Sequence, residues 1–281
     1  MLAILGGFVA AIAWAASTLC TSRASRMIPP ASVVAWVSLV GLVALAPFLL
    51  ARGVPANLDA GDTAWLAVSG AGNVAGLMLA YRAFREGAVV LLAPLISTEG
   101  AIAALIAILA GERVTPAATA ALVVIACGVG LAAWHTGGPL QAAGDSGRGV
   151  ALAGLAAVCF GVGLYATGRV SSLPLAWVIL PARLVGAVLV ALTLVATGRL
   201  RLVRPVAPLV LAAGLCEVVG FGSFALGARH DVAVTAVVAA QFAAITAIAA
   251  FLLFGERLTR IQVVGVVTLL AGVTTLSVVR G

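Results

Sequence analysis

Charged residues are scarce in this chain of 281 residues. Asp, Glu, Lys and Arg make up 9% of it, whereas hydrophobic residues make up 63% and the mean hydropathy is +1.23. A soluble protein of this size needs polar groups to cover its own surface. The shortage of charge therefore excludes a soluble globular protein and predicts one that is embedded in a lipid bilayer.

Lysine is missing altogether, so all 16 basic residues are Arg, and the formal net charge is +7. A basic protein can bind nucleic acid when its charges gather on one face or in one tail. Here the arginines are scattered over short connections between apolar segments. We therefore interpret them as anchors of membrane loops and expect no nucleic-acid partner.

Residues that hold metals or form disulfides are also few. The two histidines lie at the ends of apolar segments, and no pair among the four cysteines has metal-ligand spacing. No glycine-rich phosphate loop is present either. We expect no metal site, no cofactor, no ATP hydrolysis and no enzyme activity, and we interpret the cysteines as small core residues.

Long apolar runs, by contrast, are abundant. Such runs predict helices, because the strands of a membrane barrel are shorter and alternate in polarity. Residues 2–16 resemble the apolar part of a signal peptide, but no charged segment precedes them, so we expect a retained span. At about 20 residues for each span, ten candidates can be counted, at about 2–22, 30–50, 63–84, 87–110, 115–135, 149–168, 173–197, 205–227, 232–254 and 259–279.

One motif, Gly-Glu-Arg-x-Thr, occupies residues 111–115 and returns 144 positions later at 255–259. The glycines can take the left-handed conformation that ends a helix, and the threonines can cap the next helix. We interpret the motif as a structural turn, with a gating role as the alternative. Its first three members are Gly111, Glu112 and Arg113 in one copy and Gly255, Glu256 and Arg257 in the other.

The spacing of the two copies predicts an internal repeat. Residues 1–136 would form a first five-helix unit, residues 137–148 a polar linker, and residues 149–281 a second five-helix unit. Because five is odd, the second unit enters the membrane from the opposite side. The predicted fold is an all-α integral membrane protein with ten transmembrane helices in two inverted five-helix repeats.

This pattern resembles the EamA type of the drug/metabolite transporter superfamily. Segments 10–14 and 156–160 resemble the opening helix of each EamA unit, residues 81–88 resemble the turn before its fourth helix, and Arg183 resembles an arginine of the second unit. The resemblance implies a secondary transporter that exports or exchanges a small metabolite, an amino acid or a drug. We expect it in a bacterial inner membrane.

The orientation in the membrane is left open. The connections after odd-numbered spans carry more arginine than the others, so the positive-inside rule places both termini outside. The EamA resemblance instead implies that both termini are cytoplasmic.

Polar side chains within the apolar segments are the candidate binding site. An ionisable group at mid-bilayer costs about 2.5–3.5 kcal/mol, so it usually faces a cavity or a partner. At the 144-residue spacing, Asn73 corresponds to Glu217 and Ser97 to Gln241. Symmetry-related positions of an inverted repeat face each other near its axis, where substrates bind. The predicted substrate site is Glu217, Asn73, Gln241, Arg183 and Ser97, with Trp14 and Phe160 as aromatic lining.

Two deep carboxylates lead to a hypothesis of proton coupling, in which Glu99 or Glu217 binds and releases a proton. Glu99 lies about 200° around a helix from Ser97, so the two cannot both point at one cavity. Arg183 is a candidate ion-pair partner for either glutamate. These charges suit a zwitterion such as an amino acid, and nearly as well a cationic drug or an organic acid.

Two other classes of function remain as alternatives, an intramembrane enzyme and a non-transporting scaffold. Ser97 and Glu99 lie on different helical faces, and a scaffold gains little from buried carboxylates. We expect the partners to be the lipid bilayer, a small-molecule substrate and protons, with the chain acting as a monomer or a homodimer.

Overall fold

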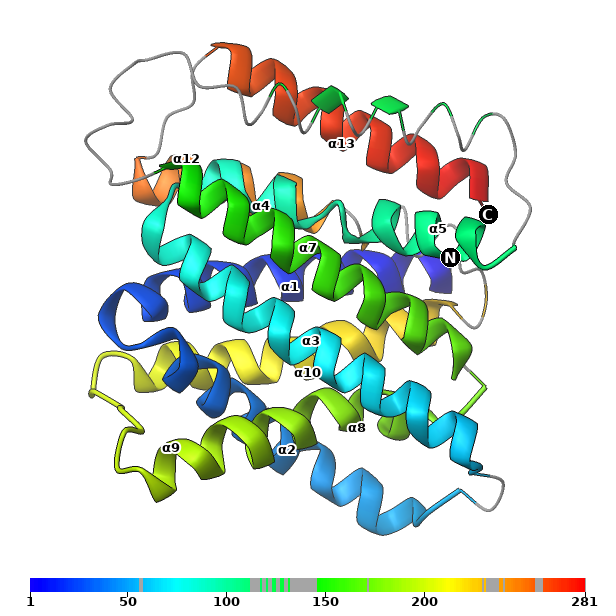
Figure 1. Cartoon of the computed structure of the whole chain (residues 1–281), viewed down its shortest axis with the longest axis vertical. Coiled ribbons are helices and arrows are strands. Elements are labelled where there is room, and N and C mark those ends of the chain that lie inside the picture. Colours follow the sequence, from blue (N-terminus) through cyan, green and yellow to red (C-terminus); the bar gives the residue numbers. More distant parts are fainter. Residues whose placement is uncertain are drawn as a thin grey trace.

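The structure, a computed structural model, describes residues 1–55, 58–111, 117, 120, 123–124, 127–128, 131, 146–170, 172–228, 230, 238–239, 241–255 and 260–280. All regular structure within these residues is helical (Figure 1). In chain order the helices are α1 (Leu2–Met27), α2 (Pro30–Arg52), α3 (Ala60–Glu86), α4 (Val89–Ile96), α5 (Glu99–Leu109), α7 (Ser146–Arg169), α8 (Leu175–Val185), η2 (Gly186–Leu192), α9 (Thr193–Ala196), α10 (Ala207–Ala228), α12 (Phe242–Phe254) and α13 (Arg260–Arg280).

Six helical segments are long and apolar enough to cross a membrane. The expected all-helical, multi-pass membrane protein is therefore confirmed for the described residues, whereas ten spans in two inverted units remain a prediction. Most of the predicted fifth span, 115–135, lies outside the described residues. The six segments are Ile4–Met27, Pro30–Ala51, Ala60–Glu86, Gly147–Arg169, Leu175–Ala196 and Ala207–Phe224.

Local sequence signals explain several helix ends. Pro30 occupies the first turn of α2, where its missing N–H costs nothing. Asp59 caps α3 by accepting a hydrogen bond from the backbone N–H of Asp62 at 2.6 Å. Gly111 and Gly255 have φ values of 94° and 66°, the left-handed backbone expected of a glycine that ends a helix. Glu112, Arg113, Glu256 and Arg257 lie outside the described residues.

The span predicted at 87–110 is interrupted, so the expectation of one unbroken helix there is wrong. Helix α4 ends at Ile96, and α5 begins at Glu99. Within α4, Pro94 has no N–H to donate. The hydroxyls of Ser97 and Thr98 bond to carbonyls three residues earlier, which competes with a regular helix.

The span predicted at 173–197 is helical, but its middle is a π-helix, η2. Gly186 opens this segment, and a Cβ there would overlap the Oγ of Ser38 on α2. The glycine therefore allows η2 to lie close to α2. Single π-turns inside α-helices are frequent at functional sites.

Helix packing follows a paired pattern (Figure 1). Helix α1 packs along α10, and α3 packs along α7 in the same way. The contacts of α12 with α1 are matched by those of α5 with α7, and the contacts of α10 with α2 by those of α3 with α8. The predicted repeat would relate the two members of each of these three pairs of contacts.

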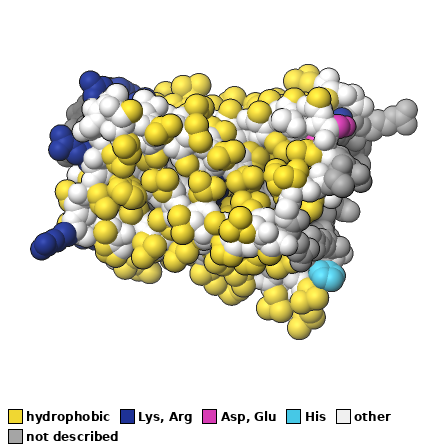
Figure 2. All heavy atoms as spheres, turned by 90° about the horizontal axis from the view of Figure 1, so that it is seen from below, with side chains coloured by type: hydrophobic (Ala, Val, Ile, Leu, Met, Phe, Trp, Pro, Cys, Tyr) yellow, Lys and Arg dark blue, Asp and Glu magenta, His cyan; other side chains and the backbone are white. Residues whose placement is uncertain are grey.

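The surface between the two ends of the bundle is broadly apolar, and arginine side chains gather at one end (Figure 2). Contacts join several helix ends there. Arg26 donates to the carbonyl of Phe84, Arg148 lies 3.3 Å from Glu86, and Trp36 donates to the carbonyl of Arg201. We call this end the arginine-rich end. It carries Arg23, Arg26, Arg82, Arg85, Arg148, Arg199, Arg201 and Arg204.

Candidate functional site

The centre of the bundle holds an ion pair shared by three helices. Nη2 of Arg183, on α8, lies 3.0 Å from Oε2 of Glu217, on α10. The other oxygen of Glu217 accepts a hydrogen bond from Ser17, on α1, at 3.0 Å. The side chain of Arg183 is 0% exposed and that of Glu217 is 11% exposed. Arg183 is thus paired with Glu217 rather than with Glu99.

The guanidinium of Arg183 has room because a glycine faces it. A Cβ at Gly41 would lie 2.6 Å from Cδ of Arg183, so α2 leaves space for the arginine stem. The guanidinium carbon lies 5.8 Å from the ring centre of Phe221. Nε and Nη1 of Arg183 are buried without a hydrogen-bond partner among the described residues. A buried donor left unpaired costs about 1–3 kcal/mol, so each of these N–H groups would be stabilised by an acceptor.

Asn73 occupies on α3 the place that Glu217 occupies on α10. Its Oδ1 is buried and has no hydrogen-bond partner in the described part of the chain. One turn away, Ser69 of α3 shares a hydrogen bond of 2.7 Å with Thr167 of α7. Asn73 therefore offers a free acceptor beside the charged pair.

Two glycines, again 144 positions apart, each face an aromatic ring. A Cβ at Gly220 would lie 2.5 Å from Nε1 of Trp14, and a Cβ at Gly76 would lie 2.5 Å from the ring of Phe160. Trp14 also packs against Phe221, with ring centres 5.2 Å apart. The lack of a side chain at each glycine therefore sets the position of an aromatic group.

These groups surround one cavity of about 130 Å³. Its walls combine aromatic rings, hydroxyls, an amide and three ionisable groups. The aromatic residues are Trp14, Tyr81, Phe84, Phe160, Phe221 and Phe242, and the polar ones are Ser17, Thr18, Thr21, Ser69, Asn73, Glu99, Thr167, Arg183 and Glu217.

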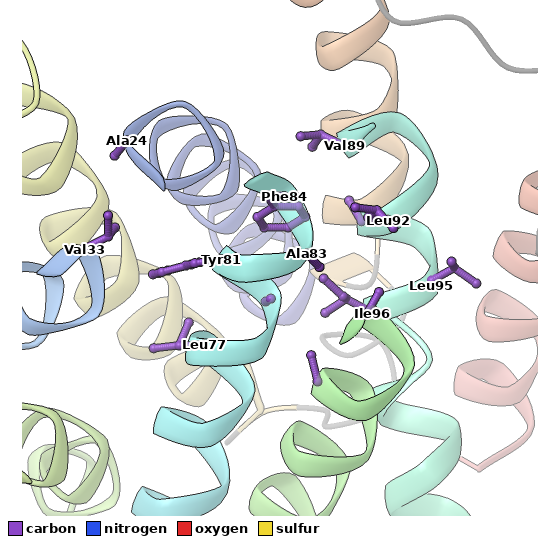
Figure 3. Close-up of a cluster of buried hydrophobic side chains, with 14 of the residues drawn as sticks. Ala24, Val33, Leu77, Tyr81, Ala83, Phe84, Val89, Leu92, Leu95 and Ile96 are labelled. Atoms are coloured by element: carbon purple, nitrogen blue, oxygen red, sulfur yellow. The ribbon is translucent and has the colours of Figure 1, made fainter. Parts of the chain in front are cut away.

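Apolar packing borders the cavity toward the arginine-rich end. Figure 3 shows side chains of α1, α2, α3 and α4 that belong to one buried apolar cluster, with Tyr81 extending from α3 toward Val33 of α2. Phe84 lies one turn beyond Tyr81, nearer the end of α3, and both are 3% exposed. The cavity and the apolar cluster share these two aromatic residues.

Six of the residues predicted for substrate or protons line this cavity, namely Trp14, Asn73, Glu99, Phe160, Arg183 and Glu217. Ser97 and Gln241 do not line it. The hydroxyl of Ser97 bonds to the carbonyl of Pro94, and the amide of Gln241 donates to Thr274 at 3.0 Å. Ser97 instead lies at the end of α4 and Gln241 at the beginning of α12, with ψ values of −6° and −7°.

The hydroxyl groups of the cavity were not predicted from the sequence. Ser17 and Thr21 follow Trp14 at helical spacings of three and seven residues, which places them on the same face of α1. Tyr81, Ser69 and Thr167 gave no comparable signal. Among the described residues, no group of three His, Cys, Asp or Glu side chains is placed to hold a metal ion.

The fold and the cavity define a multi-pass membrane protein with a polar centre between apolar-surfaced helices. Residues 1–134 match the model of the EamA-like transporter family, which belongs to the drug/metabolite transporter superfamily. The predicted resemblance to this family is therefore confirmed over residues 1–134.

Among solved structures, one chain described only as "Crystal structure of protein" has a TM-score of 0.67 and 20% sequence identity. The match covers 97% of this chain and 96% of that chain. At this identity the likeness shows the fold alone. A search of curated proteins gives no match.

Proposed function

We propose that the protein is a secondary transporter that exports or exchanges a small, amino-acid-like metabolite in a proton-coupled cycle of alternating access. One observation carries the proposal. A single intramembrane cavity holds the Arg183–Glu217 ion pair, a second carboxylate from Glu99 and an unpartnered acceptor on Asn73. Ionisable groups inside a membrane are costly and usually mark a substrate or proton pathway.

The chemistry of the lining favours a zwitterion. Nε and Nη1 of Arg183 have no hydrogen-bond partner among the described residues, and either can donate to one oxygen of a carboxylate. Glu99 and the aromatic rings match an ammonium group. A volume of about 130 Å³ lies below the roughly 300–1,000 Å³ of sites for drug-sized ligands. Size therefore favours an amino acid over a drug.

Within this proposal, Glu99 carries the proton. Glu217 is held by Arg183 and Ser17, whereas no hydrogen bond or ion pair joins Glu99 to any described side chain. A carboxyl group without a fixed partner can release its proton and bind a substrate ammonium in its place. No ion pair has to be broken first. Glu217 then keeps Arg183 in place until a substrate carboxylate arrives.

Alternating access requires two units that move relative to each other. The paired helix contacts, the matched glycine–aromatic contacts and the similar backbone at Ser97 and Gln241 support inverted repeats. The family match also ends at residue 134, near the predicted end of the first unit. In this conformation, the cluster with Tyr81 and Phe84 would close the cavity toward the arginine-rich end.

Transport by the purified protein in liposomes tests the proposal. We expect radiolabelled amino acids to accumulate when a pH gradient is imposed. Glu99→Gln should abolish this accumulation and keep exchange of substrate for substrate, because exchange needs no net proton movement. Asp62→Asn, at the beginning of α3, is the matched control. Full pH-driven accumulation by Glu99→Gln would contradict the proton role, and absence of any amino-acid flux would contradict the substrate class.

An organic cation is the second candidate substrate, favoured by the six aromatic residues of the cavity. Arg183→Gln separates the two candidates, because it removes the partner of a substrate carboxylate and leaves the aromatic lining. If the substrate is an amino acid, Arg183→Gln should abolish its flux. Cation flux that survives Arg183→Gln, with no amino-acid flux by the unchanged protein, would favour the cation. Flux of any substrate would also separate a transporter from an intramembrane enzyme or a scaffold.

A further inference from the structure

A second pocket lies at the arginine-rich end, away from the central cavity. It is bounded by the beginning of α2, the end of α3 and the beginning of α7, and its volume is about 610 Å³. Arg82, Arg85 and Arg148 line it together with one carboxylate, Glu86. It shares no lining residue with the central cavity. The proposed transport function does not use it.

The pocket has a surplus of positive charge. Nε of Arg148 lies 3.3 Å from Oε2 of Glu86, so one of the three guanidinium groups is partly compensated. The Arg148 side chain is nevertheless 69% exposed, so its remaining donors are accessible. Arg82 and Arg85 are exposed and form no ion pair within the described residues. Three converging guanidinium groups suit a phosphate group, which each can bind through paired N–H donors.

The position of the pocket points to a lipid as the source of that phosphate. Helices α3 and α7 each contain a membrane-crossing segment, and the pocket lies where α3 ends and α7 begins. Lipid headgroups lie at this level of a bilayer. Leu152 lines the pocket, and Leu155, one turn further along α7, is 55% exposed. An acyl chain attached to a bound phosphate can therefore run along the apolar face of α7.

We propose that this pocket binds the headgroup phosphate of an anionic phospholipid. Basic pockets between transmembrane helices are known to bind such headgroups. The competing explanation is a structural one, in which Arg148 and Glu86 only clamp α7 to α3. An exposed ion pair of this kind contributes little, about 0–1 kcal/mol.

Native mass spectrometry of the full chain with added lipid tests the proposal. We expect phosphatidylglycerol and cardiolipin to bind, and phosphatidylcholine to bind much more weakly. Each of Arg82→Ala, Arg85→Ala and Arg148→Ala should weaken the binding of the anionic lipids about fivefold. Arg23→Ala is the matched control, because Arg23 is exposed at the same end and does not line the pocket.

Three outcomes would overturn the proposal. Phosphatidylcholine could bind as well as phosphatidylglycerol, Arg23→Ala could weaken binding as much as the pocket variants, or inorganic phosphate could displace the lipid at equal concentration. The variant Glu86→Gln separates the lipid site from the clamp. A lipid site predicts equal or tighter lipid binding, since a negative charge is removed. A clamp predicts that Glu86→Gln and Arg148→Ala lower the Tm equally and leave lipid affinity unchanged.

Discussion

At the scale of single residues, the Arg183–Glu217 ion pair dominates the interior. Both groups are buried, and Ser17 satisfies the second oxygen of the glutamate. Removing one member of a buried pair leaves the other charge uncompensated, which costs about 3–5 kcal/mol. Replacing both members by apolar residues avoids that penalty. The pair is therefore expected to matter more for substrate recognition than for net stability.

A double-mutant cycle tests this expectation. Glu217→Leu and Arg183→Leu should each lower the free energy of unfolding by about 3–5 kcal/mol. The double variant should be more stable than either single variant, because no charge is left unpaired. Thermal unfolding in detergent measures all three. Additive losses would show that the two side chains are not coupled.

A second prediction concerns the glycine that faces Trp14. Gly220→Ala should destabilise the protein by about 1–3 kcal/mol, because the new methyl group would force the indole out of its position. Gly222→Ala on the same helix is the matched control, since no atom lies within 4 Å of a Cβ built there. The control should be neutral or stabilising by up to about 1 kcal/mol. Equal effects on the Tm would refute a specific role for the Trp14 contact.

At the scale of helices, the main finding is the break between α4 and α5, at Ser97 and Thr98. The apolar run predicted a span there, because about 20 apolar residues indicate a membrane helix whatever their order. The 144-residue repeat led to Asn73 and Glu217, which both line the cavity. It also led to Ser97 and Gln241, which do not line it, because the repeat spacing does not show where a helix ends or begins. The hydrogen bonds from hydroxyl groups to carbonyls at the end of α4 depend on side-chain rotamers, which a pattern of residue types does not specify.

A continuous helix at this break should slow transport. Pro94→Ala with Thr98→Ala restores an N–H and removes a competing hydroxyl, so the α4–α5 junction should become more regular. If the break bends during the cycle, each 1.4 kcal/mol added to its barrier slows exchange about tenfold. Substrate affinity should change little. Pro47→Ala is the control, because α2 continues past its proline without a break. An unchanged exchange rate in the double variant would rule out bending at this point.

At the scale of the whole molecule, the distribution of arginine defines two ends. The described arginines of the α1–α2, α3–α4 and α9–α10 connections, with Arg148, share one end. The beginning of α1 and the end of α13 lie at the other end (Figure 1). The sequence predicted this division, since each span reverses the direction of the chain. The convergence of Arg82, Arg85 and Arg148 on one pocket depends on helix packing and was not predictable.

The arginine-rich end should face the cytoplasm, since positively charged loops are retained there. A reporter fused after Gly281 should then lie outside the cytoplasm. Two reporters distinguish the two locations of the C-terminus. Alkaline phosphatase is active only outside the cytoplasm, and green fluorescent protein fluoresces only in the cytoplasm. Fluorescence without phosphatase activity would favour the orientation that the family resemblance implies.

The buried ion pair also has an electrical consequence. A guanidinium keeps its charge in proteins, so Arg183 and Glu217 together contribute no net charge to the cavity. A zwitterion adds none. Under the proposed mechanism, the proton on Glu99 is then the only charge that crosses in a cycle. A membrane potential of 100 mV would supply about 2.3 kcal/mol for that charge. A potassium diffusion potential should therefore drive amino-acid flux when the pH is equal on both sides of the membrane. A flux that does not depend on the membrane potential would require a second charge that moves in the same cycle and compensates for the proton.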